Sequence, residues 1–548
     1  MTQELDRLVE AYLDDIWERG PVAGTDAGIH DYDDRLPRFA PDALQEGYEK
    51  DKDWLAKFEA LDPSELDQDA WLDRLVAMAQ LRRSIGDYEE LRPAFRNPGV
   101  YVNVVSQAVF SLIERDHAPF DERMRCVLSR LRGVPTMLDQ ACSNLSEETP
   151  AVFADSALQH LTGAVRFLES TVPELAGDIP EMEDELLAAN QDALAALERF
   201  GTVVARLAEE GGADFAVGKR YYDFLLQKHH LLPLDSEAVL EMGRVAIDEI
   251  KDELKKVGEK IDPTLSWPEI VEELKRDHPP TEGVLEMYQD EVTGSRQFIE
   301  ERDLVTIPDE EGFWVEWVPP FMWATLPFHA SYPPRPFEED DRGFWRITPP
   351  DPAASPEEQE QKLQGHNRWN ARALAMHEGY PGHHMHFCLI KRLPSKIRRQ
   401  FMDPFLVEGW ALYTEELMWE QGFFDDLRGR LIQLVNALWR AVRVVAGVSM
   451  HTRGMTVDEA AEMLVEISRL GPTNARIEAQ RFTYTPTYTI SYHTGKALVS
   501  HLRADYESRL GDGFDLKSFH DELLSYGAVS PAVIQDLMKS GGDATQTS

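Results

Sequence analysis

The feature that most constrains the fold is a helical spacing of apolar residues that recurs along much of the chain. Apolar side chains stand three and four residues apart, which places them on one face of an α-helix. The clearest segments lie at 1–20, 71–91, 101–113, 121–145, 157–171, 186–207 and 236–257. No fixed period relates them, unlike the repeats of a solenoid. With 548 residues, the sequence predicts a large, mainly α-helical protein.

A strand-like pattern replaces the helical one shortly before a His-rich motif at 377–384. Residues 312–318 alternate and are rich in aromatic side chains, which is typical of a half-buried strand, and 343–348 predict a second strand. The sequence therefore predicts a single large domain over 1–540. Its parts are helices over 1–303, a small β element at about 310–350, metal-site helices over 357–452 and C-terminal helices over 456–540, followed by a disordered tail over 541–548.

Three imidazoles and one carboxylate fall within His377–His384, which reads HEGYPGHH. Imidazole is the usual protein ligand of zinc, and a metallohydrolase places its general base, a Glu, beside the first ligand. The familiar signature H-E-x-x-H sets two ligands on one helix face. Here Pro381 occupies the position of the second His. The alternative interpretation is a surface His cluster at a helix break.

Helix geometry shows how far this departure matters. On a regular helix His384 lies roughly 20° off the face of His377 and His383 roughly 120° away. Pro381 lacks an N–H and crowds the carbonyl of His377, which favours a bulge in the helix. A bulge that absorbs two residues would bring His383 to the usual place of the second ligand. We therefore predict His377 and His383 as ligands, with His384 as the alternative to His383.

A third ligand is predicted at Glu408, in a helical segment that is unusually apolar around it. Two His and one Glu form the ligand set of a catalytic zinc, which keeps one position open for water. Glu415 and Glu416 follow two turns later, and one of them could accept a hydrogen bond from a ligand imidazole. The alternative for both is a solvated acidic face.

Polar aromatic residues and an arginine gather between 477 and 495. When water attacks an amide, negative charge develops on the carbonyl oxygen and needs a positioned hydrogen-bond donor. We predict Tyr492 or His493 for this role. Arg481 could hold a substrate carboxylate in a two-bond fork, and Tyr488 could contact substrate. The alternative is that Tyr488 and Tyr492, four residues apart, are packing aromatics of one helix.

Two of these motifs carry a resemblance to a known family. His-Glu-x-x-Pro-Gly-His-His at 377–384 and Glu-Gly-Trp-Ala-x-Tyr at 408–413 resemble the hallmarks of the bacterial domain-of-unknown-function family 885 (DUF885). That family is similar to the mainly helical gluzincin zinc peptidases, such as angiotensin-converting enzyme and thimet oligopeptidase. The resemblance implies a gluzincin-like fold, a zinc hydrolase and a strand beside the cleft that pairs with substrate. The alternative for this strand is a structural hairpin that supports the helices. The chain departs from the family pattern at 487–489, which reads Thr-Tyr-Thr.

Charge and cysteine content exclude several classes of function. The net charge of −42 argues against nucleic acid and anionic membranes as partners. Cys126, Cys142 and Cys388 form no C-x-x-C pair, so neither thiolate zinc binding nor a disulfide framework is expected. The N-terminus has no basic, apolar leader, and no long apolar run predicts a membrane span. These features predict a cytoplasmic protein.

The sequence thus predicts a zinc-dependent peptidase that acts on short peptides, with one Zn²⁺ or another divalent metal. Glu378 would take a proton from the metal-activated water and pass it to the leaving amine. The first alternative is a zinc hydrolase of a non-peptide ester or amide. The second is a metal-binding or scaffold protein without catalysis, which the presence of Glu378 argues against. The sequence does not predict an oligomeric state.

Overall fold

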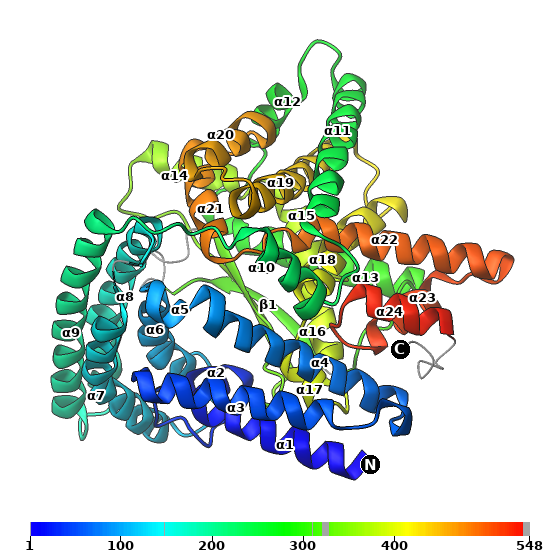
Figure 1. Cartoon of the computed structure of the whole chain (residues 1–548). Coiled ribbons are helices and arrows are strands. Elements are labelled where there is room, and N and C mark those ends of the chain that lie inside the picture. Colours follow the sequence, from blue (N-terminus) through cyan, green and yellow to red (C-terminus); the bar gives the residue numbers. More distant parts are fainter. Residues whose placement is uncertain (1, 147, 310, 320–327, 541–548) are drawn as a thin grey trace. The chain divides into compact units, whose positions relative to one another are not determined.

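The structure of the protein is a computed structural model that describes residues 2–146, 148–309, 311–319 and 328–540. It is mainly α-helical with one small sheet, as predicted, and the sheet has three strands (Figure 1). The predicted tail over 541–548 lies outside the described residues. The chain divides into two compact units, one made mainly of Met1–Val217 and the other mainly of Gly218–Val318 and Asp340–Ser548. The single domain predicted over 1–540 stays a prediction.

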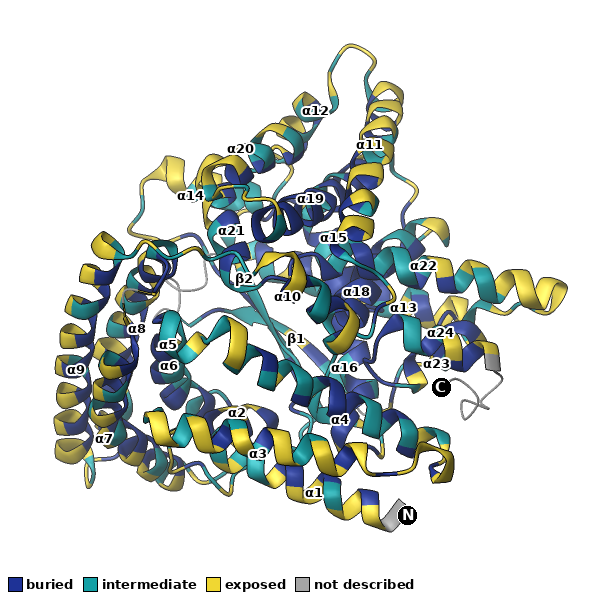
Figure 2. Ribbon diagram, in the orientation of Figure 1, coloured by how far each residue is buried: buried dark blue, intermediate teal, exposed yellow. Residues whose placement is uncertain are grey.

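The first unit is helical and has its core between its longest helices. Its helices are α1 (Thr2–Arg19), α2 (Pro21–Ala27), α3 (Pro41–Glu59), α4 (Gln68–Gly86), α5 (Pro93–Arg96), α6 (Gly99–Ile113), α7 (Phe120–Asn144), α8 (Ala151–Gly177) and α9 (Glu183–Glu210). One continuous apolar cluster joins α6 to α9 and includes Val105, Leu131 and Leu168, all fully buried. The opposite faces of α7 and α9 are exposed, as their amphipathic sequences require (Figure 2).

The second unit carries the sheet and every residue of the predicted metal site. Its helices are α10 (Gly218–Phe224), α11 (Ser236–Ile261), α12 (Trp267–Leu274), α13 (Thr281–Arg302), α14 (Pro356–Gly365), α15 (Arg368–Glu378), α16 (His383–Lys391), α17 (Lys396–Gln400), α18 (Pro404–Glu420), α19 (Leu427–Thr452), α20 (Val457–Ser468), α21 (Pro472–Tyr484), α22 (Ser491–Leu510), α23 (Leu516–Ser525) and α24 (Pro531–Ser540). By length and composition α19 could cross a membrane, but 83% of its most apolar window is buried inside the structure. Such burial is typical of a core helix, and α19 packs against α11 and α15.

The sheet has the strand order β1-β3-β2. Strand β1 (Gly312–Trp317) runs parallel to β3 (Arg342–Ile347), and β2 (His329–Tyr332) runs antiparallel to β3. The two predicted strands correspond to β1 and β3. Strand β2 was not predicted, because four residues without apolar alternation carry no strand signal of their own and pair only where β3 offers an edge.

The prediction of one bulged helix through His377–His384 is wrong. Helix α15 ends at Glu378, and α16 begins at His383. Pro381 cannot donate a helical hydrogen bond. A Cβ atom on Gly382 would overlap the carbonyl oxygen of His377, so only glycine permits this tight return of the backbone. The motif therefore forms two short helices joined by a four-residue turn, and His383 is the first residue of the second.

A close approach of two backbones fixes the position of Glu408. Helices α18 and α22 pack against each other, and a Cβ on Gly409 would stand 2.6 Å from the Cα of Gly495. A Cβ on Gly495 would overlap the carbonyl oxygen of Phe405. Glycine at both positions brings Glu408 beside the first turn of α22, which carries Tyr492.

Candidate metal centre

His377, His383 and Glu408 come together in the second unit, with one ligand atom of each within 4.8 Å of the others. All three side chains are buried. Oε2 of Glu408 lies 3.2 Å from Nε2 of His383 and 3.8 Å from Nε2 of His377. A tetrahedral zinc with ligand bonds of about 2.0–2.1 Å separates its ligand atoms by roughly 3.3 Å. The two distances from Glu408 are thus close to the spacing that such an ion requires.

The orientation of the two rings also suits a shared ion. The imidazoles of His377 and His383 are nearly perpendicular, at 88°, with centroids 4.7 Å apart. Lone pairs lie in the ring planes, so both Nε2 atoms can point at one place beside Glu408. Within the described residues, the buried Oε2 of Glu408 has no hydrogen-bond partner. This set of two His and one Glu fits a zinc ion that keeps a fourth position for solvent.

Charge coupling within the group is strong. Burial raises the pKa of Glu408, but His383 and His377 outweigh it and hold that pKa well below its usual range. Burial lowers the pKa of His377, but interactions with the carboxylates of Glu408 and Glu415 outweigh it and raise the pKa to about 9. The imidazoles therefore offset the cost of burying these carboxylates.

Of the two following acidic residues, Glu415 contacts the group. Its Oε1 lies 2.9 Å from Nδ1 of His377, so Nδ1–H donates to the carboxylate and Nε2 is left to face Glu408. Glu415 stands two helical turns after Glu408, on the same face of α18. Glu416 points elsewhere and pairs with Arg430 at 2.7 Å and Lys496 at 3.2 Å.

His329 of β2 is a neighbour that the sequence did not reveal. Nε1–H of Trp345 donates to Nδ1 of His329 at 3.2 Å, so a neutral His329 carries its proton on Nε2. Burial lowers the pKa of His329, and the charge of Glu378 acts in the opposite direction. The sheet therefore brings an imidazole to the carboxylate that follows His377. His329 stands outside any motif, and only the pairing of β2 could have indicated it.

Tyr488 and Tyr492 both adjoin the group. The hydroxyl of Tyr488 donates to Oε1 of Glu408 at 2.5 Å, and Tyr488 is 39% exposed. The ring of Tyr492 lies almost parallel to that of His377, at 10°, with centroids 6.3 Å apart. His493 makes no hydrogen bond, ion pair or ring contact with the group in the described part of the chain. Neighbouring helix residues point about 100° apart, so His493 cannot face the ligands as Tyr492 does.

Arg481 is placed near these tyrosines but not on the ligands. It forms an ion pair with Glu478 at 3.4 Å, and Glu478 also pairs with Arg443 of α19 at 2.8 Å. The guanidinium carbon of Arg443 lies 5.0 Å from the ring centroid of Tyr492. Sequence reasoning missed Arg443 because α19 reads as an apolar core helix. An arginine on the buried face of such a helix is the signal that could have found it.

His384, the alternative second ligand, belongs to a different cluster. Its Nε2 lies 2.6 Å from Oε2 of Glu311, whose oxygen also accepts a hydrogen bond from the hydroxyl of Tyr380. Sγ of Cys388 lies 3.6 Å from the same imidazole nitrogen. His383 and His384 point about 100° apart on the first turn of α16, so only one can face Glu408. The structure gives that position to His383.

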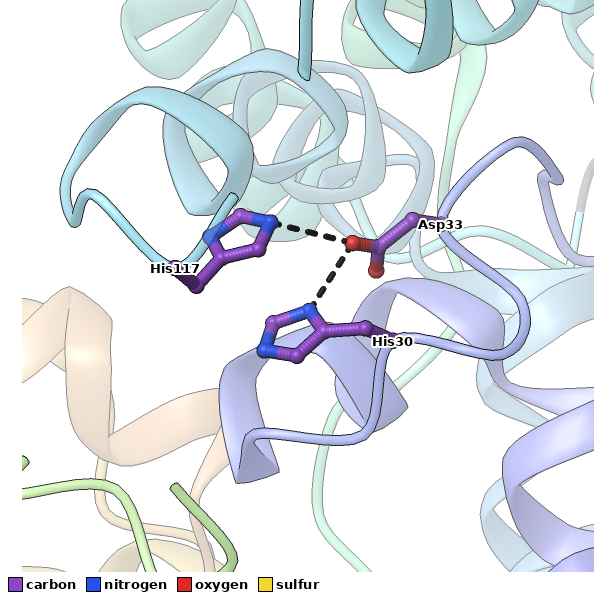
Figure 3. Close-up of side chains that lie close together, drawn as sticks. All are labelled: His30, Asp33 and His117. Carbon is purple, nitrogen blue, oxygen red and sulfur yellow. Dashed lines mark hydrogen bonds and ion pairs between the residues drawn. The ribbon is translucent and has the colours of Figure 1, made fainter. Parts of the chain in front are cut away.

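The first unit holds another group of two imidazoles and a carboxylate (Figure 3). Oδ2 of Asp33 lies 2.8 Å from Nδ1 of His30 and 3.2 Å from Nε2 of His117. The two rings are stacked, with centroids 3.9 Å apart and planes 3° apart. Parallel lone pairs in stacked planes cannot converge on one ion at bonding distance. This arrangement is that of a carboxylate clamping two imidazoles.

Comparisons with known proteins agree on the family and the fold. The family model described as "Bacterial protein of unknown function (DUF885)" matches residues 21–538. A solved structure of a putative lipoprotein of unknown function from Shewanella oneidensis is similar, with a TM-score of 0.82 and 21% identity over 98% of this chain and 99% of the other. A putative lipoprotein from Colwellia psychrerythraea gives a TM-score of 0.84 and 17% identity over 99% of both chains.

At these identities the two solved structures show the fold alone. No curated protein matched the chain. The family match covers nearly the whole chain and includes both motifs of the candidate metal centre. The chain belongs to DUF885, a family of bacterial proteins of unknown function.

Proposed function

We propose that this protein is a zinc-dependent peptidase that cleaves short peptides. The observation that carries the proposal is the geometry of His377, His383 and Glu408, whose ligand atoms converge while Glu415 orients one of the imidazoles. A structural zinc site is normally closed by four protein ligands, whereas three ligands beside a Glu that does not bind the metal are typical of a hydrolase. The resemblance of the motifs to the gluzincin peptidases supports the same conclusion.

The chain supplies the groups that peptide hydrolysis needs. When bound, zinc would polarise the scissile carbonyl and make water more acidic. Glu378, next to His377, takes a proton from the attacking water and gives it to the leaving amine. The hydroxyl of Tyr492 is the donor that we assign to the carbonyl oxygen as negative charge develops there, and Nε2–H of His329 is a second donor beside Glu378.

The small sheet suits a peptide substrate. Strand β2 pairs with β3 along one edge, and β3 lies between β1 and β2. An extended peptide can add to the other edge of β2 through backbone hydrogen bonds, with its side chains alternating on the two sides. We propose that β2 holds the substrate backbone while His329, on the same strand, contacts the scissile bond.

The two similar solved proteins, from Shewanella oneidensis and Colwellia psychrerythraea, are both described as putative lipoproteins. Lipoproteins are anchored to membranes, so this description favours the cell envelope over the cytoplasm that the sequence predicts. We therefore propose an envelope location, which fractionation of the producing cells would test. An envelope location fits a peptidase that acts on short peptides outside the cytoplasm.

The function is tested by metal content and cleavage measured on the same preparations. Purified protein is loaded with zinc, assayed by elemental analysis and incubated with a mixed library of short peptides, whose products are identified by mass spectrometry. We expect one zinc per chain and cleavage by the native protein. Glu378→Gln should keep the zinc and lose at least about 10²-fold in kcat, the contribution of a general base. Glu507→Gln, an exposed change on α22, serves as the matched control.

A parallel panel of esters and non-peptide amides separates the peptidase from the alternative hydrolase. Cleavage confined to that panel would replace peptides by another substrate class. Zinc binding without turnover of either panel would favour a metal-binding protein without catalysis. Equal activity of the native protein and Glu378→Gln would remove Glu378 from the mechanism.

A further inference from the structure

Three arginines gather beside the candidate metal centre on the side of Tyr492. Arg440 and Arg443 lie on α19 and are only 6% and 3% exposed. Arg481 lies on α21 and shares Glu478 with Arg443, through ion pairs of 3.4 Å and 2.8 Å. Both α19 arginines stack on Trp439, with their guanidinium carbons 4.4 Å and 4.2 Å from its ring centroids. Glu478 and Trp439 thus fix the directions of the guanidinium groups.

Several buried N–H groups of these arginines have no acceptor among the described residues. Among the described residues, the buried Nε atoms of Arg440, Arg443 and Arg481 have no hydrogen-bond partner, and Arg440 makes only a 3.4 Å bond to the carbonyl of Asn436. Buried donors are nearly always paired, and leaving a charged one unpaired is costly. Three such donors in one place indicate a ligand that accepts hydrogen bonds.

The local charge points to an anion. Arg443 and Arg481 share one carboxylate, that of Glu478, and Arg440 forms no ion pair among the described residues. Burial lowers the pKa of Arg440, and Glu415 acts in the opposite direction. Arginine presents a planar fork that matches two oxygens of a carboxylate. An anionic group would both fill the free donors and balance the charge.

The site lies within reach of a peptide held at the metal. Arg443 is 5.0 Å from the ring of Tyr492, and that ring is 6.3 Å from the ring of His377. An extended peptide advances about 3.3–3.6 Å per residue. A carboxylate two or three residues beyond the scissile bond therefore reaches these arginines.

We propose that Arg440, Arg443 and Arg481 form a subsite that binds a carboxylate of the substrate, a proposal that rests on the proposed peptidase function. Arg481 was expected to hold a carboxylate by itself. The structure adds the two buried arginines of α19, and makes Glu478 the residue that positions Arg443 and Arg481. The carboxylate is either the C-terminus of a short peptide or an acidic side chain near it.

Matched peptides separate the two sources of the carboxylate. N-acetyl-tetra-alanine with a free C-terminal carboxylate is compared with its C-terminal amide. The amide of N-acetyl-Ala-Ala-Glu-Ala is compared with the same peptide carrying Gln in place of Glu. We expect at least tenfold higher kcat/KM for the acidic member of one pair. A ratio near one in both pairs overturns the subsite and leaves the peptidase standing.

Variants test whether the arginines cause the preference. Arg443→Gln and Arg481→Gln should each reduce the acid-to-amide ratio below threefold, with zinc content unchanged. Arg428→Gln, a partly exposed arginine of the same helix α19 whose partner is Asp426, should keep the ratio of the native protein. If Arg443→Gln fails to fold, Arg481→Gln decides, because Arg481 is partly exposed. A preference that survives Arg481→Gln overturns the proposal.

Binding separates a failure of this subsite from a failure of the proposed function. Zinc-loaded Glu378→Gln protein is titrated with the acid and amide peptides by calorimetry. Tighter binding of the acid by tenfold or more, lost in the added Arg481→Gln change, supports the subsite even if no peptide is cleaved. Equal binding of acid and amide, or no binding of either, overturns it.

Discussion

The two units each hold two imidazoles around one carboxylate, yet they differ in what they can bind. In the first unit, the rings of His30 and His117 are 3° from parallel and stacked on one oxygen of Asp33. In the second, the rings of His377 and His383 are 88° apart. The residue types are nearly the same. The orientation of the rings decides whether their lone pairs can meet at a metal ion.

The two groups also differ in how fully the protein hydrogen-bonds their carboxylates. Around Asp33 the other oxygen accepts a hydrogen bond from Thr25 at 2.6 Å, and Arg130 lies 3.8 Å from it. The carboxylate is therefore already satisfied by the protein. Around Glu408, by contrast, Oε2 has no hydrogen-bond partner among the described residues. A carboxylate whose oxygens are both satisfied needs no further ligand, whereas an unsatisfied buried oxygen indicates one.

The largest expected difference is in metal content. His383→Ala should reduce zinc from one ion per chain to nearly none and abolish hydrolysis, because it removes one of three ligands. His117→Ala in the first unit should leave one zinc per chain and full activity. Elemental analysis of the zinc-loaded, desalted variants gives both numbers. Two zinc ions in the native protein, one of them lost in His117→Ala, would contradict the comparison.

A smaller effect is expected from the carboxylate that orients His377. Glu415→Gln should weaken zinc affinity about 10–100-fold, because the amide no longer fixes the imidazole as strongly. Glu416→Gln, at the next position of the same helix, should change zinc affinity less than twofold. Competition with a chromophoric chelator measures both affinities. Equal losses in the two variants would show that charge near the site, and not contact with His377, sets the affinity.

Much of the fold follows from apolar spacing, and the exceptions have physical reasons. The mainly α-helical class and strands β1 and β3 were predicted because their patterns are local. Strand β2 has no such pattern and exists only through pairing with β3. The Gly and Pro residues of Gly379–Gly382 indicated that the regular helix breaks there. The shape of this turn could not be predicted, because it depends on how closely the backbone of Gly382 approaches that of His377.

The residues of the candidate site also fall into those that local sequence patterns indicate and those that they do not. His377, His383, Glu408 and Glu415 were indicated by short motifs and helix periodicity, and the structure brings them together. His329 could not be found, because a lone imidazole gains meaning only beside Glu378. The arginines of α19 were hidden among apolar neighbours, since a pattern that predicts a core helix gives no role to its few charged residues.

A third prediction concerns the backbone contact that holds the second group in place. Gly495→Ala should lower the free energy of unfolding by about 1–3 kcal/mol, because the new methyl group overlaps the backbone of α18. Zinc affinity should fall with it, since Glu408 lies on that helix. Gly294→Ala on α13, where an added Cβ meets nothing within 4 Å, should be neutral or slightly stabilising. Chemical unfolding with and without zinc measures both. An intact affinity in Gly495→Ala would mean that the ligands tolerate a shift of α18.

The smallest effect is expected in the first unit and concerns pH. Burial lowers the pKa of His30, but hydrogen bonds to Asp33 and Glu338 outweigh it and raise the pKa to about 9. A pKa raised by folding means that the charged imidazole stabilises the fold fully below about pH 6.5. That stabilisation is lost as the pH rises towards 9. Burial raises the pKa of Glu338, but its bonds to His30 and Arg335 outweigh it and lower the pKa to about 2, so Glu338 contributes no change in this window.

His30→Asn removes this titration and isolates it from all others. The difference in unfolding free energy between the native protein and His30→Asn should shrink by about 1–2 kcal/mol from pH 6.5 to 8.5. The value lies below the full linkage limit because the His30 side chain is 31% exposed and partly screened. Urea unfolding at both pH values, repeated with and without zinc, measures it. A cluster held by ion pairs gives the same difference in both solutions, because no metal is part of it. A difference that depends on zinc would instead mean that the stacked rings separate to bind an ion, and the contrast between the two groups would then be one of affinity and not of kind.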